Sequence, residues 1–162
     1  MGQRMKLLLE NWQEVLNEDK KKNIASIICV NDKQQILILR RSQTDKHKPM
    51  SWDLPGGHID PSDNSIEAAA DRELQEEAGL SVDINDLIYV AQRDLKKATR
   101  YTFVTTKWAG NVELKPNPKT DIIEHDEYKW LTIDEIKDLE QSIIPNYILS
   151  KALDKIQNEQ TA

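Results

Sequence analysis

The sequence predicts an α/β fold of the α+β kind, in which strands outnumber helices. Short runs rich in β-branched residues recur along the chain, and one longer helical segment with a marked start and stop separates them into two groups. The chain has 162 residues, of which 38% are hydrophobic and 31% are charged, so it is long enough for one domain with a sizeable core. We therefore expect a single domain over residues 1–162.

The first part of the chain is expected to contain one helix and two strands. Apolar residues recur at a helical period over residues 5–17, which predicts an amphipathic helix within an N-terminal extension over residues 1–22. Two β-rich runs follow over residues 24–30 and 35–40. The polar residues 31–34 between them are typical of a hairpin turn.

The central helix is expected over residues 65–78. Asn64 is its predicted N-cap, because Glu67 follows three positions later at a spacing typical of a capping box. Gly79 suits the left-handed backbone that ends many helices. The segment therefore carries both a start and a stop signal.

The second half of the chain is expected to contain three strands and two helices. The strands are predicted over residues 87–92, 100–108 and 128–131. A short helix over residues 134–139 follows Thr132, which is placed to form a capping box with Glu135. A last helix is expected over residues 145–157.

Three glutamates of the central helix indicate a metal site. Glu73, Glu76 and Glu77 fall within one arc of the helix, because each residue advances by about 100°, and this arc overlaps the apolar arc. Like charges at this spacing repel one another, and a divalent cation would offset the repulsion. Mg²⁺ prefers carboxylate oxygens, water and substrate phosphate as ligands. The pattern therefore predicts Mg²⁺, with Mn²⁺ as the alternative ion, and phosphate chemistry.

The segment that begins at Gly57 resembles the signature of the Nudix hydrolases. That signature joins a glycine and a glutamate to the pattern Arg-Glu-apolar-any-Glu-Glu-any-Gly-apolar, and residues 72–80 read RELQEEAGL. Counting forward from Gly57 places Asp63 at the position of the first glutamate, whereas counting back from Arg72 reaches Asn64. One residue is therefore extra in this loop, and we expect Asp63 to cap or tighten the loop and not to ligate metal.

The resemblance implies a Nudix-type mixed β-sheet sandwiched between helices. It also implies that Glu76 and Glu77 are the main metal ligands, that Glu73 contributes a further ligand, and that Arg72 orients these carboxylates by ion pairing.

The glycine pair before the helix is expected to belong to the site. Gly56 and Gly57 predict a turn whose backbone can approach a metal or a phosphate closely, because glycine has no Cβ. We therefore expect both glycines to contact substrate, and Gly57 to contribute to the metal site.

Substrate-binding side chains are expected mainly in the segment before the glycine pair, with two further aromatic candidates after the central helix. The resemblance to the mutator-type nucleotide pyrophosphatases implies that Arg41 contacts phosphate and that His47 lies near the base. Trp52, Tyr101 and Phe103 are candidates for stacking on the base, and core packing is their alternative role.

The general base is expected from an acidic run before the last predicted strand. Glu124 and Glu127 are both candidates, because a carboxylate from the corresponding loop often completes the site in related Nudix proteins. A carboxylate beside a bound cation can accept a proton from the attacking water. His125 is a third candidate that ranks behind the glutamates.

The resemblance implies Mg²⁺-dependent hydrolysis of a phosphoanhydride bond in a nucleoside diphosphate linked to another moiety. Within this class we expect a nucleoside triphosphate to be cleaved to the monophosphate and pyrophosphate. Hydrolysis of dinucleoside polyphosphates or of nucleotide sugars is an alternative, and so is a non-catalytic module that senses nucleotides. Isopentenyl diphosphate isomerisation on the same fold would require a catalytic cysteine, whereas Cys29 lies in a strand well before the signature.

Composition limits the partners. A net charge of −6 argues against general nucleic-acid binding, whose footprint is a basic surface, and leaves small nucleotides as partners. The apolar runs are far shorter than the roughly 20 residues of a membrane helix. The single cysteine lies within an apolar run, which suits a reducing cytoplasm. We expect a cytoplasmic monomer or homodimer.

Overall fold

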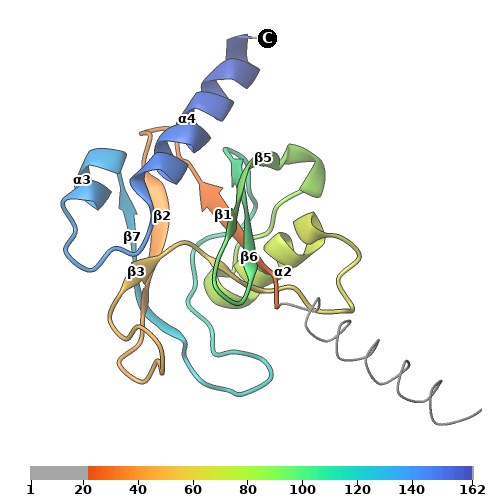
Figure 1. Cartoon of the computed structure of the whole chain (residues 1–162), viewed down its shortest axis with the longest axis vertical. Coiled ribbons are helices and arrows are strands. Elements are labelled where there is room, and N and C mark those ends of the chain that lie inside the picture. Colours follow the sequence, from red (N-terminus) through yellow and green to blue (C-terminus); the bar gives the residue numbers. More distant parts are fainter. Residues whose placement is uncertain (1–21, 162) are drawn as a thin grey trace, which may run out of the picture.

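The computed structural model describes residues 22–161, so the helix predicted over residues 5–17 lies outside the described residues. Two β-sheets lie at its centre (Figure 1). One has the strand order β4-β1-β6-β5, with bounds Gly56–His58, Ile24–Cys29, Thr99–Thr105 and Ile88–Asp94. The other has the order β3-β2-β7, with bounds Trp52–Asp53, Ile36–Arg41 and His125–Leu131. Because β1 and β6 are parallel and the other pairs are antiparallel, the four-stranded sheet is mixed, as predicted.

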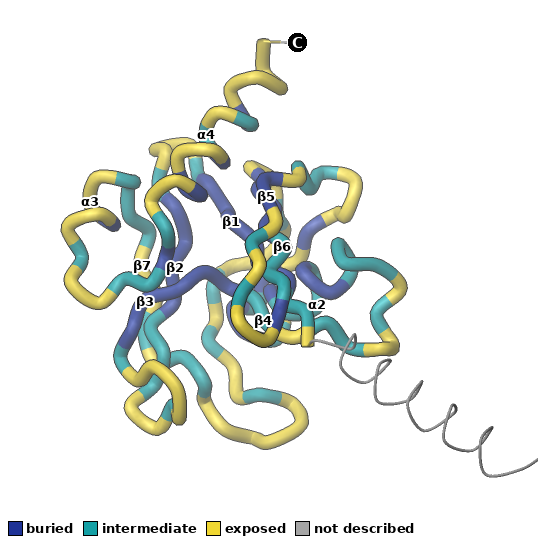
Figure 2. The backbone as a smooth tube through the Cα atoms, viewed as in Figure 1, coloured by how far each residue is buried: buried dark blue, intermediate teal, exposed yellow. Residues whose placement is uncertain are grey.

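Strands β1 and β2 are buried on both faces, because successive side chains of a strand point to opposite sides. Ile28 and Ile38 pack in one cluster with helix α4 (Asn146–Thr161). Ile27 and Leu37 pack in another cluster with helix α2 (Ile66–Ala78). The buried backbone of both strands is visible in Figure 2. The two sheets therefore lie between helices α2 and α4, and the predicted fold class is confirmed.

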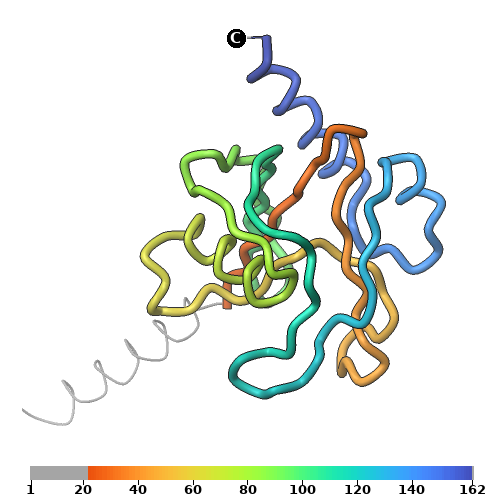
Figure 3. The backbone as a smooth tube through the Cα atoms, turned by 180° about the vertical axis from the view of Figure 1, so that it is seen from behind, coloured from red at the N-terminus to blue at the C-terminus, as the bar shows by residue number. Residues whose placement is uncertain are grey.

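The predicted turn between the first two strands is present, but the strands do not continue as a hairpin. Gln34 N donates to Asn31 O. An isolated bridge joins Val30 to Ile36, and the strands then separate into different sheets (Figure 3). Each strand finds other partners, since β1 pairs with β4 and β6 while β2 pairs with β3 and β7. The separation leaves an opening between the sheets at the start of β1.

Helix α2 begins one residue later than predicted. Ser65 is its N-cap, with extended backbone (φ −159°, ψ 169°) and a side chain that accepts a hydrogen bond from Ala68 N. The prediction of Asn64 as N-cap was therefore wrong, because the neighbouring hydroxyl reaches the free N–H group. The predicted stop at Gly79 is confirmed by its left-handed φ of 71° and its hydrogen bond to Gln75 O.

The later elements are present with shifted ends. Strands β5, β6 and β7 cover the three predicted strands, although β6 ends at Thr105 and β7 begins already at His125. Helix α3 (Ile133–Lys137) has the predicted capping box of Thr132 and Glu135. Helix α4 continues beyond its predicted end.

The prediction missed the shortest elements. These are strands β3 and β4 and a 3-10 helix over Ile84–Asp86. The predicted glycine turn was wrong, because Gly56 and Gly57 lie in β4 and pair with Ser26 and Ala25 of β1. Between residues 22 and 161, none of the helices combines the length and apolar character needed to cross a membrane.

Candidate active site

A cavity of about 1010 Å³ lies where β1 and β2 diverge. Its lining comes from the start of β1, the end of β2, strands β3, β4 and β6, helix α2 and the segment before β7. The charged side chains that line it include Arg41, Asp53, Glu73, Glu77, Arg100 and Glu124. Acidic and basic residues therefore face the same space.

Helix α2 brings its three glutamates to the cavity, as its helical period predicts. Glu73, Glu76 and Glu77 all line the cavity, with Glu77 the most deeply buried at 8% exposure. Glu77 Oε2 accepts a hydrogen bond of 3.0 Å from Gly56 N. The N–H group of the glycine strand thus contacts a carboxylate of the neighbouring helix.

Burial raises the pKa values of two of these glutamates. Burial raises the pKa of Glu73 to about 7, and the neighbouring charge of Glu76 adds to the rise while Arg72 opposes it. Burial also raises the pKa of Glu77 well above its usual range, against the hydrogen bond from Gly56. The carboxylates are crowded and buried, so a bound cation would favour their charged form.

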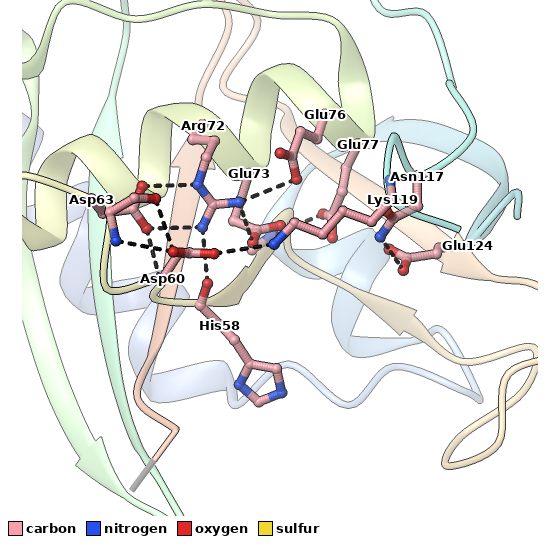
Figure 4. Close-up of polar contacts among 12 residues, drawn as sticks. His58, Asp60, Asp63, Arg72, Glu73, Glu76, Glu77, Asn117, Lys119 and Glu124 are labelled. Atoms are coloured by element: carbon pink, nitrogen blue, oxygen red, sulfur yellow. Dashed lines mark hydrogen bonds and ion pairs between the residues drawn. The ribbon is translucent and has the colours of Figure 1, made fainter. Parts of the chain in front are cut away.

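Arg72 organises the outer side of this carboxylate group (Figure 4). Its Nη1 donates to Glu73 Oε1 at 3.0 Å and to Glu76 Oε2 at 3.2 Å. Its Nη2 donates to His58 O at 3.0 Å. Hydrogen bonding to Asp63 raises the pKa of Arg72 further, so the guanidinium stays charged. One cation therefore sets the positions of two glutamates and of the strand in front of them.

The structure places Asp63 in a loop that it helps to close. Its two carboxylate oxygens accept hydrogen bonds from Arg72 Nε at 2.8 Å and Nη2 at 2.9 Å. Asp60 N also donates to it, at 2.8 Å. These hydrogen bonds, led by those from Arg72, lower the pKa of Asp63. Both oxygens of this shorter side chain are engaged by protein groups.

Of the candidate bases, the structure brings Glu124 and His125 to the cavity and leaves Glu127 outside it. One ligand atom from each of Glu77, Glu124 and His125 lies within 4.8 Å of the others. Asn117 Nδ2 donates to Glu124 Oε1 at 2.8 Å. Glu127 is 41% exposed in its side chain and pairs with Arg40 at 3.1 Å.

His125 is held in its neutral form. Burial lowers the pKa of His125 to about 4, and the positive charge of Arg41 lowers it further. A neutral imidazole can offer a nitrogen to a cation or to a proton.

Two of the expected substrate-binding residues are not at the cavity. His47 is exposed in the loop between β2 and β3 and is not part of the lining. Trp52 is 6% exposed and packs in the core, with Arg40 and Lys129 over its ring. Arg41 does line the cavity. Trp52 therefore has the alternative role named for it, packing in the core.

The other two aromatic candidates also pack inside the protein. Phe103 is buried in a cluster with Ala69 and Ala70 of α2, and Tyr101 packs against the same cluster. The described aromatic side chains therefore do not line the cavity.

Several cavity residues were missed by the sequence analysis. They include Asp53 and Arg100, which lie in strands β3 and β6, and Asn117 and Lys119, which lie in the segment before β7. Lys119 Nζ donates to Asp60 Oδ2 at 3.1 Å (Figure 4). A charged residue inside a predicted strand is a signal that could have identified Arg100, because such residues are rarely buried without a partner.

The residues of the site fit a divalent cation. The donors on the α2 side are carboxylate oxygens, which suit Mg²⁺ or Mn²⁺. A Cβ at Gly57 would lie 2.5 Å from Glu73 Oε2, so glycine leaves room for the carboxylate against the strand. We call Glu73, Glu76, Glu77 and Glu124 the carboxylate wall, and Arg41 and Arg100 together with Asp53 the arginine wall.

Known proteins share both the sequence pattern and the fold. A Bacillus subtilis protein that is named provisionally as an 8-oxo-dGTP diphosphatase is 44% identical over 69 residues, which cover 43% of this chain and 42% of that protein. An asymmetrical bis(5'-nucleosyl)-tetraphosphatase from Mus musculus is 31% identical over 117 residues, which cover 68% of this chain and 73% of that protein.

A solved structure supports the fold assignment. The MutT NUDIX hydrolase from Burkholderia pseudomallei superposes with a TM-score of 0.65 at 20% identity, over 80% of this chain and 96% of that one. A family model described as NUDIX domain matches residues 20–150. The family model covers the signature in α2 and both sheets. This chain therefore belongs to the Nudix hydrolase family.

Proposed function

We propose that the protein hydrolyses a phosphoanhydride bond in a nucleoside diphosphate derivative, with Mg²⁺ as cofactor and Mn²⁺ as a substitute. The preferred substrate in this proposal is a nucleoside triphosphate, which would yield the monophosphate and pyrophosphate. The observation that carries the proposal is the pairing of a carboxylate wall and an arginine wall in one cavity. A polyphosphate with bound cations would use both walls. Its cations would bind the carboxylates, and its free phosphate oxygens would bind the arginines.

The residues would divide the work as follows. Glu73, Glu76 and Glu77 would hold the cation, and Arg72 would keep the first two in place through its hydrogen bonds. When bound, the cation neutralises phosphate charge and lowers the pKa of a water molecule. Glu124 lies beside Glu77 and is the side chain that we propose takes the proton of the attacking water.

The arginine side of the cavity would bind the phosphate chain. Arg41 and Arg100 line the cavity and present guanidinium groups, which form paired hydrogen bonds with phosphate oxygens. Gly56 and Gly57 leave the strand next to the carboxylates free of side chains.

A dinucleoside polyphosphate is the second candidate substrate. The Mus musculus relative, whose name assigns it to this class, covers more than two thirds of this chain at 31% identity. Arg41→Ala separates the candidates, because a strand-end guanidinium should contribute more to a free phosphate end than to phosphates bridged between two nucleosides. We expect a several-fold larger loss of kcat/KM for triphosphates. Equal losses for both classes would favour the dinucleoside substrates.

We also propose that the partners are small nucleotides, that the protein does not bind nucleic acids in general, and that it acts in the cytoplasm as a monomer or homodimer. Size-exclusion chromatography with light scattering would determine the oligomeric state.

The decisive experiment is a substrate screen. Wild-type protein is incubated with nucleoside triphosphates, 8-oxo-dGTP, dinucleoside tetraphosphates and nucleotide sugars, with Mg²⁺, Mn²⁺ or a chelator, and the products are resolved by chromatography. Glu77→Gln is the inactive control, and Glu67→Gln on the same helix is the matched control outside the cavity lining. Metal-dependent cleavage that Glu77→Gln abolishes would support the proposal. Binding without cleavage of any substrate would instead support the nucleotide-sensing alternative.

A further inference from the structure

The arginine wall has a buried anion at its centre. The Asp53 side chain is 4% exposed and lies in β3, between an arginine of β2 and an arginine of β6. Its Oδ2 accepts from Arg41 Nη2 at 3.3 Å, and its Oδ1 accepts from Arg100 Nη1 at 3.3 Å. Leu54 N also donates to Oδ1, at 2.8 Å. One carboxylate therefore connects the two sheets across the opening between them, near the start of β1 and the end of β2.

Arg100 reaches the cavity from the second residue of strand β6. Arg100 pairs with Ile24 of β1 in parallel register, and both residues line the cavity. Its side chain is 17% exposed, and its Nε is buried without a hydrogen-bond partner among the described residues. Guanidinium groups have five N–H donors, and buried donors without acceptors are costly. The hydrogen bond to Asp53 leaves most of these donors for another acceptor.

Arg41 differs from Arg100 because a second aspartate shares it. Asp45 Oδ2 accepts from Arg41 Nη1 at 3.2 Å, in addition to the contact with Asp53. Among the described residues, the carboxylate that Arg100 contacts is that of Asp53. In the described part of the chain, Arg100 is therefore the arginine of the pair with fewer acidic partners to compete with a substrate anion.

The position of Arg41 and Arg100 suits a second phosphate group, next to the phosphate that would contact the cation. Arg41 opposes His125 across the pairing of β2 and β7, and Asp53, Arg41 and Arg100 line the same cavity as Glu77, Glu124 and His125. The arginine wall is thus close to the group formed by Glu77, Glu124 and His125. An extended phosphate chain that starts at the carboxylate wall would reach the arginines next.

We propose that Asp53 holds Arg100 and Arg41 as a two-arginine clamp for the phosphate chain, and that Arg100 is a substrate-binding residue that sets the preference for polyphosphates. This inference rests on the proposed function, because it assigns the second phosphate contact of the same site. Asp53 acts as a positioning residue: it separates the two guanidinium groups and keeps them from pairing with the carboxylate wall.

The test compares Arg100→Gln and Arg100→Lys with Arg40→Gln. Arg40 is the neighbour of Arg41 on β2, but it pairs with Asp126 and Glu127 and is not part of the cavity lining. All three variants are first checked by thermal unfolding. Inorganic tripolyphosphate with Mg²⁺ is then titrated into each protein in a calorimeter, and KM and kcat are measured on the best substrate of the screen.

We expect Arg100→Gln to weaken tripolyphosphate binding by about tenfold or more, as loss of a charge-assisted hydrogen bond implies. KM should rise by a similar factor, with a smaller change in kcat. Arg100→Lys should recover part of the binding, because it keeps the charge without the planar fork. Arg40→Gln should bind like wild type.

Asp53→Asn tests the positioning role. It should also raise KM, and its tripolyphosphate binding should fall although both arginines remain. If Asp53→Asn does not fold, the Arg100 variants still decide the inference.

The inference would be overturned if Arg100→Gln bound tripolyphosphate as wild type does, or if wild type did not bind it. The inference would also be overturned if Arg100→Gln and Arg40→Gln lost tripolyphosphate affinity to the same extent. A general loss of positive charge would then be the cause. Failure of the proposed function has a different signature, namely tripolyphosphate binding that depends on Arg100 without cleavage of any nucleotide.

Discussion

The two walls of the cavity are organised by opposite charges. In the carboxylate wall one cation, Arg72, holds acidic side chains of its own helix, whereas in the arginine wall one anion, Asp53, holds two arginines from different sheets. Three of the four glutamates of the carboxylate wall come from one short stretch of helix α2, and Glu124 joins them from the segment before β7. The arginine wall exists only after three strands from two sheets have come together. Most of the acidic side of the cavity is therefore local in sequence, whereas its basic side is assembled by the fold.

The largest expected effect concerns the carboxylate wall. Glu76→Gln and Glu77→Gln should each lower turnover by at least about a hundredfold, because each removes a ligand charge at nearly constant volume. Turnover and circular dichroism are measured together, with Glu67→Gln as the control on the same helix. A folded Glu77→Gln variant with nearly the wild-type rate would remove the basis for the assigned ligands.

The second-largest expected effect is on kcat, and it distinguishes Glu124 from Glu127 as the general base. Glu124→Gln should lower kcat by roughly tenfold to a hundredfold, more than it changes KM, whereas Glu127→Gln should resemble wild type. The loss in Glu124→Gln should shrink as the pH rises, because hydroxide replaces the missing base. The pH dependence of the rate is the measurement. A large loss in Glu127→Gln, or no loss in either variant, would transfer the role to another group, with His125 next.

The third prediction concerns the stability of the carboxylate wall without metal. The folded-state pKa of Glu73 is raised from the ordinary value of 4.5 to about 7. The folded protein therefore binds this proton more tightly than the unfolded chain, and the resulting stability is fully present below about pH 4.5 and is lost as the pH rises through 7.

In the presence of a chelator, wild type should therefore lose about 1–3 kcal/mol more than Glu73→Gln between these pH values, after allowance for partial exposure of the side chain. Denaturant unfolding at several pH values measures the difference. Added Mg²⁺ should reduce it, because the cation favours the charged carboxylate. Parallel pH curves for wild type and Glu73→Gln would contradict the prediction.

The smallest expected effect on catalysis is that of Asp63. Asp63→Asn should leave the Mg²⁺ concentration for half-maximal rate nearly unchanged, because both carboxylate oxygens are engaged by Arg72 and by the loop. Its effect should instead be a loss of stability of about 1–3 kcal/mol, as expected when a buried, charged hydrogen-bond partner is removed. A large rise in the required Mg²⁺ concentration would show that Asp63 contacts the metal.

Neighbouring residues were sufficient to predict the helix that carries the three glutamates. The period of the α-helix places Glu73, Glu76 and Glu77 on one side, and Gly79 ends the helix because glycine adopts the left-handed backbone without a steric penalty. The strands β1, β2, β5, β6 and β7 were also predictable, since each has enough β-rich residues to form a visible run. Local backbone geometry decides these features, so neighbouring residues are sufficient to reveal them.

Which residues join the three glutamates at the cavity depends on strand pairing across the fold. The register between β2 and β7 shifts between Arg40 and Arg41, so that Arg40 opposes Glu127 while Arg41 opposes His125. Such a bulge changes which side chains of a strand share a face, and a plain alternation of residues does not predict it. Glu127 therefore pairs outside the cavity, although it is only two residues from His125.

The arginine wall could not be predicted from the sequence, because it also depends on contacts between distant strands. Asp53 lies in a two-residue strand that has no periodicity to detect, and Arg100 follows it by 47 positions in the chain. Their contact depends on the angle at which the two sheets separate after Val30 and Ile36. Helical spacing could place the three glutamates of α2 on one side of the helix, but only the packing of two sheets could bring the arginines to the same cavity.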